Sequence, residues 1–69
     1  MKIRFIKDVT VDVMDPNSGD NDTYDRLMRS GVSVDCVEVL PISRGFSNVY
    51  LDSGEVLIDL RNDYFTKES

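Results

Sequence analysis

Apolar and polar residues alternate through the first part of the chain. Apolar side chains occupy odd positions, with polar residues between most of them, at Ile3, Phe5, Val9, Val11 and Val13. A period of two predicts β-strand, because successive side chains of a strand point to opposite faces. Ile6 and Lys7 break the alternation, which predicts a bend, a bulge or a tight turn at Lys7–Asp8. The segment is therefore one kinked strand or two short strands.

The next region is polar and then ambiguous. Every residue from Asp15 to Asp22 is a turn former or a small polar residue, which predicts a loop. Residues 23–31 contain an acid in the position of a first helical turn and end at Gly31, as a short helix does. An edge strand through Tyr24–Leu27 fits the same residues. Both interpretations stay open at this point.

Alternation returns in the second half of the chain. The valines from Val32 to Val39 change phase once, which predicts a bulge at Asp35–Cys36. Pro41 has no backbone N–H to donate to a ladder, so the strand is expected to end there. Ser43–Gly45 is a predicted turn.

The segments that follow predict a hairpin. Phe46–Leu51 and Val56–Leu60 are alternating runs, separated by a short glycine-containing turn at Asp52–Glu55. The second run is predicted to place Val56, Ile58 and Leu60 on one face. Phe5 and Phe65 are expected in the core.

The order of these elements indicates a fold class. Arg61–Asp63 looks like a single tight or 3₁₀ turn, and Tyr64–Thr66 like a short closing strand. The prediction is an all-β domain spanning residues 1–69, closed or nearly closed, because closure protects exposed strand edges. A long loop after the first strand, a tight hairpin and a 3₁₀ turn before the last strand resemble an SH3-like small barrel of five to six strands. The chain has no tryptophan to line a polyproline groove, so peptide binding of the SH3 type is not expected.

Composition excludes several classes of function. The 69 residues are 41% hydrophobic and 30% charged, which is typical of a globular domain and not of a disordered one. No apolar run approaches the roughly 18 residues of a membrane helix, and a single cysteine, Cys36, favours the cytoplasm, here of a bacterial host. The absence of histidine removes Ser/His/Asp and Cys/His nucleophiles and ordinary zinc sites. We therefore expect no enzyme activity, catalytic residue, metal or cofactor.

Negative charge is concentrated in one stretch. The formal net charge is -5, and residues 8–25 contain aspartates but no base. An acidic partner-binding face is predicted from Asp12, Asp15, Asp20, Asp22 and Asp25. The alternative is a solvated loop in which aspartates act as turn residues. As a calcium loop, residues 15–22 have Gly19 one place early and Arg26 where a bidentate acid belongs, which favours the solvated loop.

A second candidate surface combines aromatic residues and an arginine. Tyr50 alternates with Val49 and Leu51, so it is expected to face away from the core together with Phe46. Arg44 lies close to them in sequence, and aromatic residues with arginine are typical of binding hot spots. Arg44, Phe46 and Tyr50 form the second predicted patch.

The size and charge of the chain resemble those of small phage and mobile-element accessory proteins of the anti-CRISPR and anti-restriction type. That resemblance implies a non-enzymatic inhibitor whose acidic face occupies a basic nucleic-acid-binding surface of a host defence complex. One alternative is a small barrel that binds single-stranded nucleic acid through Phe46 and Tyr50, although the acidic charge argues against direct nucleic-acid binding. Another is a phage structural or assembly module that self-associates through an edge strand. The expected partner is a protein with a basic surface and not a membrane.

Overall fold

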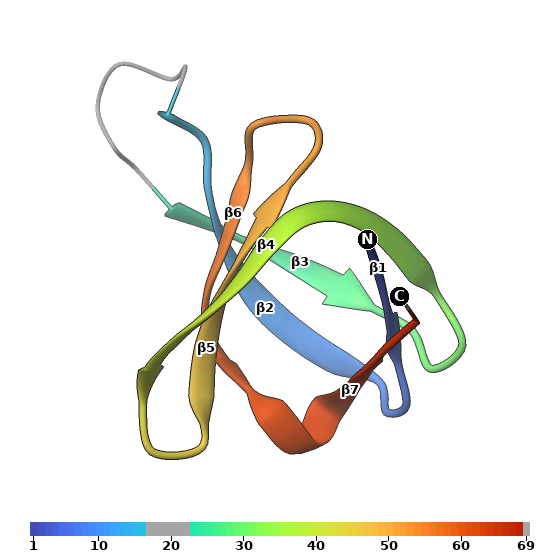
Figure 1. Cartoon of the computed structure of the whole chain (residues 1–69). Coiled ribbons are helices and arrows are strands. Elements are labelled where there is room, and N and C mark those ends of the chain that lie inside the picture. The colour runs from blue at the N-terminus through green and yellow to red at the C-terminus, as the bar shows by residue number, and fades with distance from the viewer. Residues whose placement is uncertain (17–22, 69) are drawn as a thin grey trace.

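The structure, a computed structural model, describes residues 1–16 and 23–68 (Figure 1). The regular elements of this part of the chain are β-strands and one 3₁₀ turn. The strands are β1 (Lys2–Phe5), β2 (Val9–Met14), β3 (Thr23–Met28), β4 (Ser33–Ser43), β5 (Phe46–Leu51), β6 (Val56–Arg61) and β7 (Phe65–Lys67), and the 3₁₀ turn η2 is Asn62–Tyr64. The predicted all-β class is confirmed. There are seven strands instead of five or six, because the break at Lys7–Asp8 separates β1 from β2 and residues 23–28 form a strand of their own.

The strands form one antiparallel sheet in the order β3-β2-β6-β5-β4-β1-β7. β4 is shared, since Ser33–Asp35 pairs with β1 and the remainder pairs with β5. Among the described residues the sheet ends at β3 and β7 and is not closed, so the expected closure is not observed. The curl visible in Figure 1 comes from strand twist together with the bulges described below.

One cluster of apolar side chains forms the core. Its fully buried members are Ile3, Phe5, Val13, Cys36, Val49 and Leu57. Phe65 joins the same cluster at 8% exposure, so both phenylalanines predicted for the core are confirmed. We call the sheet face that carries this cluster the inner face and the opposite face the outer face. Burial of each large apolar side chain contributes about 1.5–3 kcal/mol, and a domain this small depends on each of them.

β4 continues through two positions at which the sequence predicts irregularity. Its register against β5 shifts between Cys36 and Glu38, one residue beyond the predicted bulge at Asp35–Cys36. Pro41 does not end the strand, and that prediction is wrong. Pro41 pairs with Ser47 of β5, while the ladder between β4 and β1 covers only Ser33–Asp35. The proline therefore lies in the half of β4 that has β5 as its one partner strand among the described residues, and proline is tolerated on such edges.

A bulge in β6 overturns the predicted face assignment of that strand. Val49 is opposite Leu57 and Ser47 is opposite Leu60, so β6 contains one more residue than β5 between these pairs. Leu57 and Leu60 both lie in the core cluster, whereas Val56 is buried outside that cluster. The prediction that Val56, Ile58 and Leu60 share one face is therefore wrong. The extra residue places Asp59 at φ 54, in the left-handed region, and its backbone N–H donates to Asn48 Oδ1 at 3.2 Å.

The open assignment of residues 23–31 is settled in favour of a strand. Thr23–Met28 forms β3 and pairs with β2 along its full length, from Thr23 opposite Met14 to Met28 opposite Val9. Inner-face burial of Met28 against the core stabilises this pairing more than one isolated helical turn is stabilised by its own hydrogen bonds. Within residues 1–16 and 23–68, no helix has the length and apolar character needed to cross a membrane.

Substitutions at Asp59 test the bulge. Asp59→Asn removes the charge but keeps a side chain that tolerates the left-handed region, whereas Asp59→Ala does not. We expect the alanine variant to be less stable than the asparagine variant by about 1 kcal/mol in urea unfolding. Asp59→Gly should be at least as stable as the asparagine variant. Equal stability of the alanine and asparagine variants would contradict the left-handed backbone at this position.

Candidate protein-interaction face

Aspartates from neighbouring strands meet on the outer face. Asp25 of β3 is directly opposite Asp12 of β2, and Asp12 is in turn opposite Ile58 of β6. Asp59 follows Ile58 at the bulge, and all three aspartates are exposed. Directly opposite residues on adjacent strands have Cβ atoms about 4.5–5.5 Å apart. We call Asp12, Asp25 and Asp59 the aspartate cluster.

The aspartate cluster carries charges that repel one another. The pKa of Asp12 is raised above its ordinary value of 3.8, first by a side-chain hydrogen bond with Asp25, and further by partial desolvation and the charges of Asp25 and Asp59. A hydrogen bond between two carboxyl groups requires that one of them holds a proton. Close to neutral pH the cluster therefore keeps like charges side by side, an arrangement that destabilises a cross-strand pair.

Five of the eight basic side chains are paired with acids outside the aspartate cluster. Five ion pairs join Lys2 to Asp35, Arg4 to Glu68, Arg26 to Glu55, Arg29 to Asp8 and Arg61 to Asp63, at 2.9–4.0 Å between nitrogen and oxygen. Within the described part of the chain, no ion pair joins a base to a member of the aspartate cluster. These five bases therefore make their ion pairs outside the aspartate cluster, although Arg61 also lines a hollow with Asp12 and Asp59.

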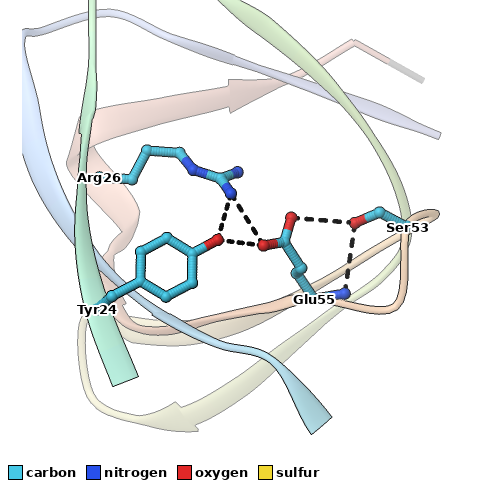
Figure 2. A network of polar contacts seen from close by, with 4 residues as sticks. All are labelled: Tyr24, Arg26, Ser53 and Glu55. Carbon is cyan, nitrogen blue, oxygen red and sulfur yellow. Dashed lines mark hydrogen bonds and ion pairs between the residues drawn. The ribbon is translucent and has the colours of Figure 1, made fainter. Parts of the chain in front are cut away.

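A polar network explains why Arg26, the residue next to Asp25 in sequence, does not neutralise the cluster. Arg26 follows Asp25 along β3, so its side chain lies on the inner face, where Nη2 donates to Glu55 Oε2 at 2.9 Å and to the Tyr24 hydroxyl oxygen. Figure 2 shows Tyr24, Arg26 and Ser53 gathered around the Glu55 carboxylate. The Tyr24 hydroxyl donates to Glu55, which lowers the pKa of Glu55, as Arg26 also does, and raises the pKa of Tyr24. The network ties β3 to the turn between β5 and β6.

The predicted acidic face is found only in part. Asp12 and Asp25 are brought together as predicted, and Asp15 is half-buried just beyond the end of β2. Asp20 and Asp22 lie outside the described residues, as do all of residues 17–22 of the segment compared above with a calcium loop. Sequence reasoning missed Asp59, because strict alternation does not reveal the bulge that places it near Asp12. The weak signal available was that Leu57 and Leu60 are apolar and three residues apart.

The second predicted patch is divided between two ends of β5. Phe46 and Tyr50 do share the outer face, as expected, but four residues of a strand separate them by about 13 Å. Tyr50 is half-buried opposite Glu38 and Val56. Phe46 is 37% exposed, is paired with Arg61, and lines with Arg44 an open hollow of about 500 Å³. We call Arg44, Phe46 and Arg61 the basic corner.

Neither Cys36 nor a metal-binding group adds a site among the described residues. Cys36 is 1% exposed, and burial raises the pKa of its thiol, which disfavours the reactive thiolate. No group of three or more acids or cysteines in residues 1–16 and 23–68 is arranged to hold a metal ion. Comparison with known proteins found no matching family model, curated protein or solved structure.

Asp12→Asn should stabilise the protein at neutral pH. The folded state raises the pKa of Asp12, so it binds that proton more tightly than the unfolded state does. The associated stability is present below the ordinary value of 3.8 and is lost as the pH rises through the raised pKa. Asparagine can donate to Asp25 without a titrating proton, so we expect thermal unfolding at about pH 7 to shift upward by about 2–5 °C. The difference should disappear at about pH 3, and an unchanged difference there would contradict the electrostatic cause.

Glu55→Gln should show the opposite dependence on pH. The folded state lowers the pKa of Glu55 below 4.5, so its contribution is present above 4.5 and is lost as the pH falls through the lowered pKa. We expect the variant to lose about 1 kcal/mol at about pH 7, since the ion pair with Arg26 is removed. Urea unfolding at several pH values measures this, with Glu38→Gln, an exposed position on β4, as the control. A constant loss at all pH values would show that packing, not charge, is responsible.

Proposed function

We propose that this protein is a non-catalytic interaction module whose aspartate cluster binds a basic surface of a partner protein. The single observation that carries the proposal is an exposed group of three aspartates on adjacent strands, without an ion pair to any described base. Five bases are meanwhile used by other acids. Repulsion within the cluster reduces stability, and a partner that supplies cations relieves it.

The chemistry of the cluster favours a partner surface that also binds nucleic acid. Arginine and lysine recognise carboxylate and phosphate oxygens by the same charge-assisted hydrogen bonds. Closely spaced carboxylates on a rigid sheet therefore present the kind of anionic oxygens that a phosphate-binding surface accepts. The long-range field of such a face also accelerates encounter with a basic partner. The narrower proposal, that the partner is a host defence complex inhibited in this way, is supported by the small size and the charge of -5.

The arrangement of strands supports a further part of the proposal, an SH3-like organisation. β4 is long and is shared between β1 on one side and β5 on the other. The 3₁₀ turn η2 comes directly before the last strand, β7, which pairs with β1. These features fit the resemblance, while the hairpin of β2 and β3 adds an edge to the sheet by pairing with β6.

The basic corner favours a second candidate, direct binding of single-stranded nucleic acid. Phe46 offers a partly exposed ring for base stacking, and Arg44 and Arg61 flank the same hollow. Arg61 is already paired with Asp63 at 3.2 Å, and Tyr50 is half-buried beside Glu38. The corner thus provides fewer free cations than a phosphate backbone requires, and the acidic interaction face remains the first proposal.

A capture experiment with charge-matched variants tests the acidic face. The test variant carries Asp12→Asn, Asp25→Asn and Asp59→Asn, and the control carries Asp35→Asn, Asp52→Asn and Asp63→Asn, which changes the formal charge of -5 by the same amount. Both are compared with wild type in capture from a bacterial lysate, followed by release with double-stranded DNA. We expect wild type and control to capture the same nucleic-acid-binding protein and to release it when DNA is added. The test variant should capture at least about tenfold less of that protein.

Each contrary result has a defined meaning. Equal losses in both variants would show that net charge alone drives capture, which overturns the role of the aspartate cluster. Stronger binding of a single-stranded oligonucleotide by the test variant, without any captured protein, would favour the nucleic-acid-binding candidate. Capture of no DNA-displaceable protein by wild type would overturn the proposed function.

A further inference from the structure

β3 is an edge strand of the sheet formed by the described residues. β2 is its only partner strand in the described part of the chain, and β3 stands at the end of the strand order. It contains neither proline nor glycine, and Leu27 is 52% and Tyr24 42% exposed. The opposite edge, β7, is half as long, with three residues against six. A long edge that exposes apolar side chains is a template for pairing with another strand.

The charges of β3 argue against pairing with a second copy. Two antiparallel copies related by a two-fold axis perpendicular to the sheet must place one residue opposite itself, because opposite residues share a face. The two registers with the longest overlap place Asp25 opposite Asp25 or Arg26 opposite Arg26. Like charges directly opposite each other destabilise a strand pair. Self-association through this edge is therefore disfavoured.

The same charges favour a different, basic strand. A residue placed opposite Asp25 by an added strand points to the outer face beside Asp25, with Asp12 one strand further on, about 10 Å away. A hydrogen bond with Asp25 raises the pKa of Asp12 most, and the charges of Asp25 and Asp59 raise it further; a cation at this position would offset the effect of those charges. On the inner face, Arg26 is already satisfied by Glu55 at 2.9 Å, so it imposes no matching acid on the incoming strand.

We propose that β3 receives an extended segment of a partner protein as an additional antiparallel strand, with an arginine opposite Asp25. An arginine fits better than a lysine, because its planar donors can form two parallel hydrogen bonds to one carboxylate. An apolar residue two positions before this arginine lies opposite Leu27 on the same face and covers its exposed side chain. The inference rests on the proposed function and adds to it the backbone mode of recognition and the pattern that is recognised.

Synthetic peptides and nuclear magnetic resonance test this pairing on the full chain. The probe is a capped threonine peptide with a valine and, two positions later, an arginine. One control is the same peptide with glutamate in place of arginine. The other is a pair of arginine peptides N-methylated at alternate residues, each of which lacks the N–H donors of one strand edge. We expect the arginine peptide, at millimolar concentration, to shift the amide signals of β3 and to protect alternate β3 amides from hydrogen exchange. The glutamate peptide, and the N-methylated peptide whose blocked edge faces β3, should each bind at least about tenfold more weakly than the arginine peptide.

A charge exchange at Asp25 separates charge from folding effects. Asp25→Lys is an exposed substitution, and its amide spectrum reports whether the fold is retained. In this variant the glutamate peptide should bind β3 better than the arginine peptide. Observation of this reversal would support strand addition next to position 25.

The remaining outcomes distinguish this inference from the proposed function. Equal binding of the N-methylated and unmethylated arginine peptides would overturn strand addition and leave an acidic face that binds by charge alone. Equal binding of the arginine and glutamate peptides at β3 would overturn the arginine preference together with the proposed function. Absence of β3 shifts with every peptide, or a wild-type dimer with protected β3 amides in sedimentation and exchange, would also overturn the inference.

Discussion

Leu57 and Leu60 both reach the core although three residues separate them along β6, and the bulge between them makes this possible. β6 lies between β2 and β5, so its phase determines what both neighbours meet. If β6 alternated regularly, one of the two leucines would face solvent. The bulge satisfies the core and places Asp59 on a backbone conformation that few residues adopt easily. A requirement of the inner face thus brings a third carboxylate next to Asp12 and Asp25 on the outer face.

The distribution of ion pairs separates stability from surface charge. The inner side of β3 is joined to the turn between β5 and β6 by the contacts of Tyr24 and Arg26 with Glu55. The other pairs lie on exposed positions and contribute little each. These pairs thereby use bases outside the aspartate cluster. The sheet keeps two neighbouring residues of β3, Asp25 and Arg26, in opposite electrostatic environments simply because alternate side chains point to opposite faces.

Much of the fold could be predicted from alternation, and most errors occurred where alternation is interrupted. The strands Phe46–Leu51 and Val56–Arg61 and the 3₁₀ turn were visible in the pattern of apolar residues and turn formers. The pattern did not predict which residues of β6 share a face, because its bulge adds a residue at Asp59, where no glycine indicates an irregular backbone. Pro41 was expected to end β4, because its place at an edge depends on which strands are neighbours, and that is a property of the whole sheet. The density of aspartates indicated an acidic face in this part of the chain. That Asp12 lies opposite Asp25 depends on the register of β2 and β3, which charge density does not give.

The pairing of β1 with β7 sets the order in which the domain can fold. Phe5 is opposite Phe65, and Ile3 is opposite Lys67, so core residues from the two ends of the sequence are direct neighbours. Closing a loop of nearly the whole chain costs conformational entropy before these contacts repay it. The pairs β2–β3 and β5–β6 join segments close in sequence, whereas β1 has no β7 to pair with until that strand is available. During synthesis on a ribosome, which proceeds at about 5–20 residues per second, the core is therefore completed only after β7 has emerged.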